Sequence, residues 1–157
     1  MGERARILIV DDDESIRKVV ATILHEKGYA VDTAETGKEA ISKSNKKFYN
    51  LALIDMRLPD MEGTQLLMSM RETTPRMVKI IMTGYPSLQN AMEAVNKSAD
   101  AYLLKPVNMD KVLSTIDEHL KRQQGEKKYS QNKITEFIET RVKELEKEQI
   151  ATKKTAR

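Results

Sequence analysis

The sequence alternates short apolar runs with longer stretches whose apolar residues recur at helical spacing, and this alternation restricts its fold more than any other feature. Each run has four or five residues, mostly β-branched or large and apolar, and most runs are nearly continuous. Continuous runs of this length are typical of strands buried on both faces. We therefore expect strands at Arg6–Val10, Ala30–Ala34, Leu51–Ile54, Val78–Met82 and Ala101–Leu104.

The stretches between these runs carry one apolar helical face each and are bounded by residues that favour helix ends. Gly28 and Thr73-Thr74-Pro75 are typical of helix ends, whereas Pro86-Ser87 and the N-cap residue Asn108 are typical of helix starts. The predicted faces are Ile16, Val19, Val20, Ile23 and Leu24; Ala40 and Ile41 within Thr36–Lys47; Leu66, Leu67 and Met70; Leu88, Ala91, Met92 and Val95; and Val112, Leu113, Ile116 and Leu120.

Strands that alternate with helices need right-handed crossovers, which place helices on both faces of a parallel sheet. A closed barrel of eight such units needs roughly 250 residues, more than the 157 present. The sequence therefore predicts an α/β protein with an open three-layer sandwich. In such sheets ligands bind beyond the carboxyl ends of the strands, so functional residues should directly follow the apolar runs.

Polar and charged residues do follow four of these runs: Asp11-Asp12-Asp13, Asp55, Thr83-Gly84 and Lys105-Pro106. Each set alone fits a solvated loop or a helix cap. Four such sets at one edge of a sheet favour a functional site. After Asp55, Pro59 and Gly63 also predict a defined turn into the next helix.

The expected cluster suits a divalent cation and a phosphoryl group. Carboxylates of Asp11, Asp12 and Asp55 on one rim repel one another unless a cation lies among them or one holds its proton. Oxygen ligands without nearby His or Cys favour Mg²⁺, Mn²⁺ or Ca²⁺ over zinc, and an open rim favours Mg²⁺. Lys105 can neutralise a phosphoryl group and Thr83 can donate a hydrogen bond to it. Asp55, after the middle strand, is the predicted phosphoryl acceptor.

With these motifs the chain from about Arg6 to Leu120 resembles the receiver domain of two-component response regulators. The resemblance rests on Ile-Val-Asp11-Asp12-Asp13, Leu-Ile-Asp55-Met-Arg-Leu-Pro59-Asp-Met-Glu-Gly63, Ile-Met-Thr83-Gly84 and Leu-Leu-Lys105-Pro106. It implies a flavodoxin-like (βα)5 sheet with strand order 2-1-3-4-5, in a receiver domain of residues 5–122.

The resemblance also implies how the cation is held. Asp12 would bind Mg²⁺ directly and Asp11 largely through water, whereas Asp13 would open a helix. Asp55 would be both metal ligand and phosphoacceptor. The backbone carbonyl of Arg57 would complete the protein ligands, and Mn²⁺ could replace Mg²⁺.

Thr83 and Lys105 would contact the phosphoryl oxygens, and the Lys105–Pro106 peptide bond would be cis. Tyr102 would follow Thr83 inward after phosphorylation. The face formed by the fourth helix, fifth strand and fifth helix would then change shape, as a population shift.

Residues 123–157 are predicted to form a helical extension with a basic, mobile end. Gln123-Gln124-Gly125 is expected to break or bend the fifth helix. A stripe of apolar residues then predicts an amphipathic helix from about Gln131 to Gln149. The stripe must be buried on the receiver or on a partner, and one hypothesis is a homodimer through this helix. It covers about two heptads, fewer than a coiled coil needs. Its members are Ile134, Phe137, Ile138, Val142 and Leu145.

Charge and composition limit the partners. Residues 1–120 carry 16 basic and 18 acidic residues, whereas residues 121–157 carry 11 and 6. The tail is too short for a DNA-binding domain with its own core and its charges alternate in sign, so nucleic-acid binding is not expected. Cysteine is absent and neither a signal peptide nor a membrane-spanning run is visible. These absences favour a cytoplasmic protein without membrane contact.

The leading hypothesis is a response regulator that takes a phosphoryl group from a sensor histidine kinase and passes a shape change to an unidentified protein partner. It would not be an enzyme beyond its own phosphorylation and dephosphorylation. A phosphorelay intermediate and a phosphate sink are alternatives that the sequence does not separate from it. A Mg²⁺-dependent aspartyl phosphohydrolase is disfavoured, because such enzymes place an acidic residue where this chain has Arg57.

Overall fold

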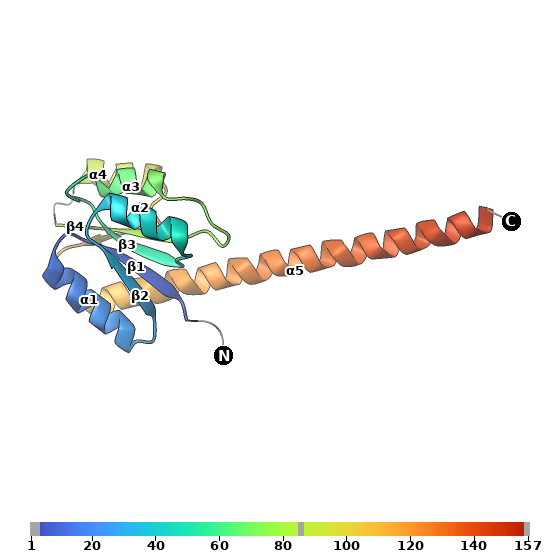
Figure 1. The fold of residues 1–157 in the computed structure, drawn as a ribbon, viewed down its shortest axis with the longest axis horizontal. Helices are drawn as coiled ribbons and strands as arrows, with labels where there is room; N and C mark the ends of the chain where they lie inside the picture. Colours follow the sequence, from blue (N-terminus) through green and yellow to red (C-terminus); the bar gives the residue numbers. More distant parts are fainter. Residues whose placement is uncertain (1–3, 85–86, 156–157) are drawn as a thin grey trace. The chain divides into compact units, whose positions relative to one another are not determined.

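The computed structural model of the chain describes residues 4–84 and 87–155. The chain divides into two compact units, Met1–Gln123 and Gln124–Arg157. The first unit holds a five-stranded parallel sheet in the order β2-β1-β3-β4-β5, with helices on both faces (Figure 1). The predicted three-layer α/β fold and its strand order are confirmed.

Strands and helices alternate along the chain as the apolar pattern predicts. The strands are β1 (Arg6–Val10), β2 (Ala30–Ala34), β3 (Leu51–Asp55), β4 (Val78–Thr83) and β5 (Ala101–Leu104). The helices are α1 (Glu14–Glu26), α2 (Gly37–Lys46), α3 (Gly63–Ser69), α4 (Leu88–Asn96) and α5 (Met109–Thr155).

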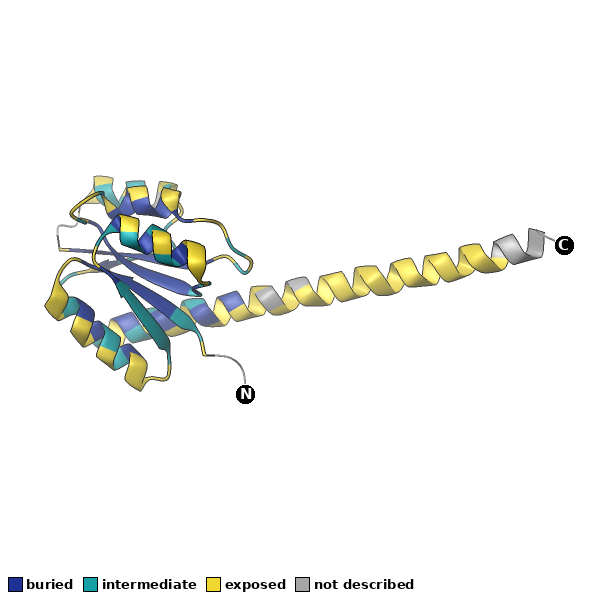
Figure 2. Cartoon of the chain, viewed as in Figure 1, coloured by how far each residue is buried: buried dark blue, intermediate teal, exposed yellow. Residues whose placement is uncertain are grey.

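The two faces of the sheet contribute to two hydrophobic cores. Ile7 and Ile9 of β1 pack with α1 and the first turns of α5, whereas Leu8 and Val10 pack with α2, α3 and α4. β1, β3 and β4 are buried on both faces over nearly their whole length (Figure 2). Their apolar runs are continuous for this reason, since no residue of a doubly covered strand faces water.

Three predicted helix boundaries are observed where the sequence places them. The third helix differs, since α3 ends at Ser69, before its predicted face residue Met70 and the predicted stop Thr73-Thr74-Pro75. The Asp13 carboxylate caps α1 by accepting a hydrogen bond from the backbone N–H of Ile16 at 3.2 Å. Gly28 follows α1 with φ +96°, a conformation that glycine adopts without a Cβ penalty. Asn108 caps α5 by accepting from the backbone N–H of Lys111 at 3.3 Å.

The predicted buried face of α4 is wrong in part. Leu88 and Met92 are 79% and 56% exposed, whereas Ala94 is buried in the core. The short alanine side chain packs on this part of the sheet, and Leu88 and Met92 remain largely in water. The Val95 side chain of the predicted face and Pro86 of the predicted helix start lie outside the described residues.

A similar correction applies to α1. Val20 and Leu24 are buried as predicted, but Val19 is 54% exposed. An apolar stripe read from spacing alone is wider than the part of it that reaches the sheet.

The predicted break in the fifth helix is wrong, because α5 runs from Met109 to Thr155 without interruption at Gly125. Glycine in a helix interior costs only about 1 kcal/mol relative to alanine, and the Gln, Glu and Lys residues around it are good helix formers. Every residue from 131 to 150 is exposed (Figure 2). Among the described residues, no helix is both long enough and apolar enough to cross a membrane.

Gln123 has a structural role that the sequence analysis did not predict. Its side chain is almost fully buried, and its Nε2 donates to the carbonyl oxygens of Asn50 and Arg76 at 2.9 and 2.8 Å. Its Oε1 accepts from Asn50 Nδ2 at 3.1 Å, and Asn50 Oδ1 accepts from the backbone N–H of Arg6 at 2.9 Å. Gln123 thus binds α5 to the amino ends of β3 and β4, and through Asn50 to β1.

We expect Gln123→Ala to lower the free energy of unfolding by about 1–3 kcal/mol, because the variant loses three part-buried hydrogen bonds, to the carbonyl oxygens of Asn50 and Arg76 and to Asn50 Nδ2. Urea unfolding followed by circular dichroism would measure this. Gln124→Ala is the matched control, since Gln124 is an exposed glutamine in the same helix. Equal losses in the two variants would contradict the anchoring role of Gln123.

Candidate functional site

The residues predicted to form the site meet at the carboxyl ends of four adjacent strands. Asp11 directly follows β1, Asp55 ends β3, Thr83 ends β4 and Lys105 directly follows β5. β3 lies between β1 and β4 in the sheet. Asp55 is therefore the central acid of this edge.

Three carboxylates lie together here. One oxygen from each of Asp11, Asp12 and Asp55 lies within 4.8 Å of the other two. Asp11 is fully buried, Asp55 is 8% exposed and Asp12 is exposed. Oxygen ligands that are buried on one side and open to water on the other fit a hard divalent cation that keeps part of its hydration shell. The residues present therefore suit Mg²⁺.

Lys105 joins two of these acids. Its Nζ lies 2.9 Å from Asp11 Oδ2 and 3.4 Å from Asp55 Oδ2. Its backbone N–H donates to the carbonyl oxygen of Thr83 at 2.7 Å, which ties the end of β5 to the end of β4. The Lys105–Pro106 peptide bond is cis, as the family resemblance implies.

The electrostatics of the site single out Asp55. Burial raises the pKa of Asp55 to about 6, the charge of Asp11 adds to the rise, and Lys105 opposes it. Burial acts to lower the pKa of Lys105, but its hydrogen bond to Asp11 and the charges of Asp11 and Asp55 bring that pKa above its ordinary value. The site thus has more negative than positive charge, which a bound cation would balance.

The loop after Asp55 passes close to the strand that it leaves. The backbone N–H of Gly63 donates to the carbonyl oxygen of Met56 at 2.6 Å. A Cβ atom added at Gly63 would lie 2.5 Å from the carbonyl oxygen of Asp55, so this position requires glycine. The backbone N–H of Arg57 points to Asp55 Oδ1 at 3.4 Å. The turn predicted from Pro59 and Gly63 thus keeps Arg57 beside the acceptor.

Thr83 and Tyr102 lie on neighbouring strands, β4 and β5. Thr83 is buried, with 2% of its surface exposed. The Tyr102 ring packs against the core beneath α2, α3 and α4. Within the described part of the chain, its buried hydroxyl has no hydrogen-bond partner.

Two residues that the sequence analysis did not single out contact the loops of the site. Arg17 of α1 donates from Nη1 to the carbonyl oxygen of Asp11 at 2.8 Å. Asp60, in the loop after Asp55, accepts from the backbone N–H groups of Gly37 and Lys38 at 2.8 and 2.9 Å. In the sequence, Arg17 looks like any charged helix residue and Asp60 like any turn residue, so only their partners in space mark them.

The fold and the site together define a receiver-type signalling domain: a doubly wound parallel sheet with an acidic group, a lysine and a threonine at its carboxyl edge. A model of the response regulator receiver domain matches residues 7–117. The chain belongs to the response regulator receiver family.

Individual relatives agree with this assignment. The chain is 37% identical over 119 residues to the transcriptional regulatory protein ZraR of Klebsiella oxytoca, covering 76% of this chain and 27% of that protein. It is 29% identical over 121 residues to the transcriptional regulatory protein TrcR of Mycobacterium tuberculosis, covering 77% and 47%. The chain therefore spans about a quarter to a half of the length of these curated relatives.

Solved structures show the same fold over the receiver. A CheY-like receiver domain protein from Methanospirillum hungatei JF-1 is 47% identical with a TM-score of 0.76, covering 79% of this chain and 99% of that one. The beryllofluoride-activated NtrC4 receiver domain dimer is 36% identical with a TM-score of 0.70, covering 75% and 98%.

We expect Asp55→Asn to stabilise the metal-free protein at pH 7. The folded pKa of Asp55 is raised from 3.8 to about 6, so ionised Asp55 destabilises the fold above pH 6, by roughly 1–3 kcal/mol. This cost disappears as the pH falls towards 4 and the wild-type carboxyl takes up its proton. Urea unfolding at pH 7 and pH 4 with a chelator would test this. A variant that is no more stable than the wild type at pH 7 would show that burial does not penalise the Asp55 charge.

Proposed function

We propose that this chain is a two-component signalling receiver in which Asp55 accepts a phosphoryl group from a sensor histidine kinase, with Mg²⁺ as cofactor. The observation that carries this proposal is the group of Asp11, Asp12 and Asp55 oxygens within 4.8 Å of one another, with Lys105 Nζ 3.4 Å from Asp55. These are the charges that phosphoryl transfer to a carboxylate needs around the acceptor.

The same residues account for the cofactor. Asp12 and Asp55 would bind Mg²⁺ directly, Asp11 would bind it largely through water, and the backbone carbonyl of Arg57 would complete the protein ligands. Mn²⁺ has the same preference for oxygen and could replace it. When bound, the cation supplies positive charge to the phosphoryl oxygens and orients them.

In the transfer, a carboxylate oxygen of Asp55 attacks phosphorus in line with the leaving nitrogen of the kinase histidine. The new P–O bond forms an acyl phosphate, while the P–N bond breaks and its electron pair returns to the histidine, which takes up a proton. Lys105 then neutralises one phosphoryl oxygen, and the Thr83 hydroxyl donates a hydrogen bond to another. The chain would catalyse only its own phosphorylation and dephosphorylation.

Phosphorylation would be read through Thr83 and Tyr102. A buried hydroxyl without a hydrogen-bond partner costs about 1–3 kcal/mol, and the Tyr102 hydroxyl is buried in this way. An outward rotamer, in which the hydroxyl reaches water, would therefore have a free energy close to that of the inward rotamer. A small bias from Thr83 could then move the population between the two positions. This supports Tyr102 as the switch residue.

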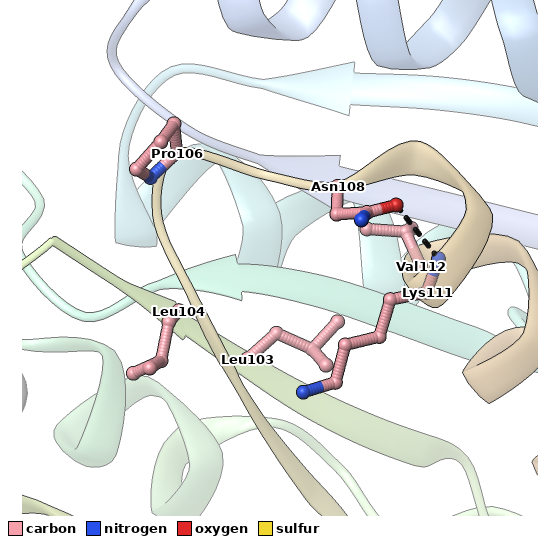
Figure 3. A pocket seen from close by; sticks show the side chains of 6 residues that line it. All are labelled: Leu103, Leu104, Pro106, Asn108, Lys111 and Val112. Atoms are coloured by element: carbon pink, nitrogen blue, oxygen red, sulfur yellow. Dashed lines mark hydrogen bonds between the residues drawn. The ribbon is translucent and has the colours of Figure 1, made fainter.

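The surface next to Tyr102 suits an output partner. Leu88 and Met92 of α4 and Leu104 of β5 are more than half exposed. A hollow of about 190 Å³ lies between β5 and the start of α5 (Figure 3). It is lined by Leu103, Leu104, Pro106, Asn108, Lys111 and Val112. Leu104 thus lines the hollow, and clustered exposed apolar side chains are typical of protein docking surfaces.

We assign residues 5–122 to the receiver and residues 123–157 to a helical extension that ends in a basic terminus. We expect protein partners rather than nucleic acid for the extension, because its charges alternate in sign up to Lys153-Lys154. The cytoplasm is the compartment in which a histidine kinase would supply the phosphoryl group.

The main test is phosphorylation of the purified chain by a small acyl phosphate with Mg²⁺. Intact-mass spectrometry should show one added phosphoryl group that is lost on treatment with hydroxylamine, as expected of an acyl phosphate. Asp55→Asn should abolish this addition. Lys105→Ala should slow it at least tenfold, since removing one such charge contact typically costs that much or more. Unchanged labelling of Asp55→Asn would refute the proposal.

The extension supports a second element of the proposal, namely that two copies of the chain pair through α5. Its apolar stripe is 43–72% exposed in the single chain. Arg141 and Glu144 form an ion pair at 3.0 Å, so both charge signs flank the stripe and a second copy would meet no uniform repulsion. The stripe consists of Ile134, Phe137, Ile138, Val142 and Leu145.

We expect Ile138→Asp to shift the chain from dimer to monomer in sedimentation equilibrium, with dimer affinity reduced at least tenfold, because a charge in a buried apolar seam is costly. Thr140→Asp is the control, since it adds the same charge on the opposite face of the helix. An Ile138→Asp variant with the average mass of the wild type would exclude this pairing.

A further inference from the structure

Residues 34–38 comprise the end of β2, the loop that follows it and the first turn of α2. They lie next to two loops of the site, the one after β1 that carries Asp12 and the one after β3 that carries Arg57. On one side they reach the loop after β1. The backbone N–H of Asp11 donates to the carbonyl oxygen of Ala34 at 3.1 Å. Arg17 donates to the carbonyl oxygen of Asp11 at 2.8 Å from Nη1 and to Glu35 Oε1 at 3.2 Å from Nη2. The Arg17 side chain is only 11% exposed, so it is held in this position.

On the other side they reach the loop after β3. Both oxygens of Asp60 accept from the first turn of α2, from the backbone N–H groups of Gly37 and Lys38. Met61 adds a packing contact, because a Cβ atom at Gly37 would overlap the side chain of Met61. The loop that follows Asp55 and carries Arg57 is thus bound to α2 by two hydrogen bonds and a close contact.

These contacts matter because the carboxylates at the edge of the sheet repel one another. Asp12 lies on the loop after β1, and the loop after β3 begins directly beyond Asp55. One oxygen from each of Asp11, Asp12 and Asp55 lies within 4.8 Å of the other two. Without a common support, repulsion would move the loops apart in the cation-free protein. A cation would then have to bring them together at the expense of its affinity.

We propose that Arg17 and Asp60 are positioning residues that anchor the loops after β1 and β3 to residues 35–38 and so hold the spacing that a divalent cation requires. This inference rests on the proposed function, because it assumes that the group of Asp11, Asp12 and Asp55 binds Mg²⁺. Neither residue touches the reacting atoms.

A plain structural role for Asp60 is the competing explanation, since it also caps α2. The structure offers a matched way to separate the two roles. Thr36 is the N-cap of the same helix, and its hydroxyl accepts from the backbone N–H of Glu39 at 3.1 Å. Among the described residues, Thr36 forms no hydrogen bond with the loop after β3. Thr36→Ala therefore weakens the start of α2 without releasing that loop.

The experiment is a calorimetric titration of the full chain with Mg²⁺ alone. We expect Asp60→Ala to raise the Kd for Mg²⁺ by about tenfold, at the lower end of what loss of an orienting partner costs a metal site. Asp60→Asn should give an intermediate Kd, because one amide oxygen replaces two carboxylate oxygens. Thr36→Ala should leave the Kd within about twofold of wild type while lowering the unfolding midpoint.

The outcomes separate this inference from the proposed function. If the wild type binds no Mg²⁺, or if the Asp12→Ala variant binds Mg²⁺ as tightly as the wild type, the proposed cofactor site itself is wrong. If the wild type binds Mg²⁺ but Asp60→Ala does so equally well, or Thr36→Ala weakens binding as much as Asp60→Ala, the positioning role is overturned. If Asp60→Ala fails to fold, the Kd of Glu35→Ala for Mg²⁺ tests the inference instead. Glu35 is 67% exposed, and its loss removes the hydrogen bond that connects Arg17 to the loop before α2. An unchanged Kd in this variant would overturn the inference.

Discussion

The rest of the site depends on one interaction, the attraction of Lys105 to two acids that repel each other. Lys105 Nζ lies 2.9 Å from Asp11 and 3.4 Å from Asp55, and it offsets part of the charge that burial makes costly. The net charge of the site stays negative. Burial, together with the charge of Asp11, therefore raises the pKa of Asp55 to about 6 despite Lys105. A buried carboxylate whose charge is not fully compensated lowers the stability of the fold. In the proposed function, a cation and a phosphoryl group balance the charges of the site.

The sheet provides the geometry for this interaction through its backbone. Parallel strands end at a common edge, so Asp11, Asp55, Thr83 and Lys105 meet although up to 94 positions separate them in the chain. Close approach of the next loop then requires glycine at position 63. Residues 35–38 provide contacts outside the sheet, since Arg17 connects Glu35 to the loop after β1 and Asp60 connects the first turn of α2 to the loop after β3. A precise site thus depends on contacts well beyond the acids.

Two surfaces away from this edge expose large apolar side chains. α4 turns Ala94 to the core and leaves Leu88 and Met92 in water, so its largest apolar side chains contribute little to stability. The later turns of α5 expose an apolar stripe in the same way. In both places apolar side chains that a single chain does not bury lie on helices of the signalling module.

Local and periodic features were readable from the amino-acid sequence alone: the continuous apolar runs, the caps at Asp13 and Asn108, and the acids, threonine and lysine after the strands. They determine the α/β class and which residues gather at one edge, because strand ends converge wherever a parallel sheet forms. Tertiary structure alone decided which apolar faces are buried, as Leu88 and Val19 show, since spacing does not tell a core face from an exposed one. It also decided that α5 continues past Gly125 and that Gln123, Arg17 and Asp60 serve as anchors. A polar side chain acquires such a role only from partners distant in sequence, and no local pattern encodes them.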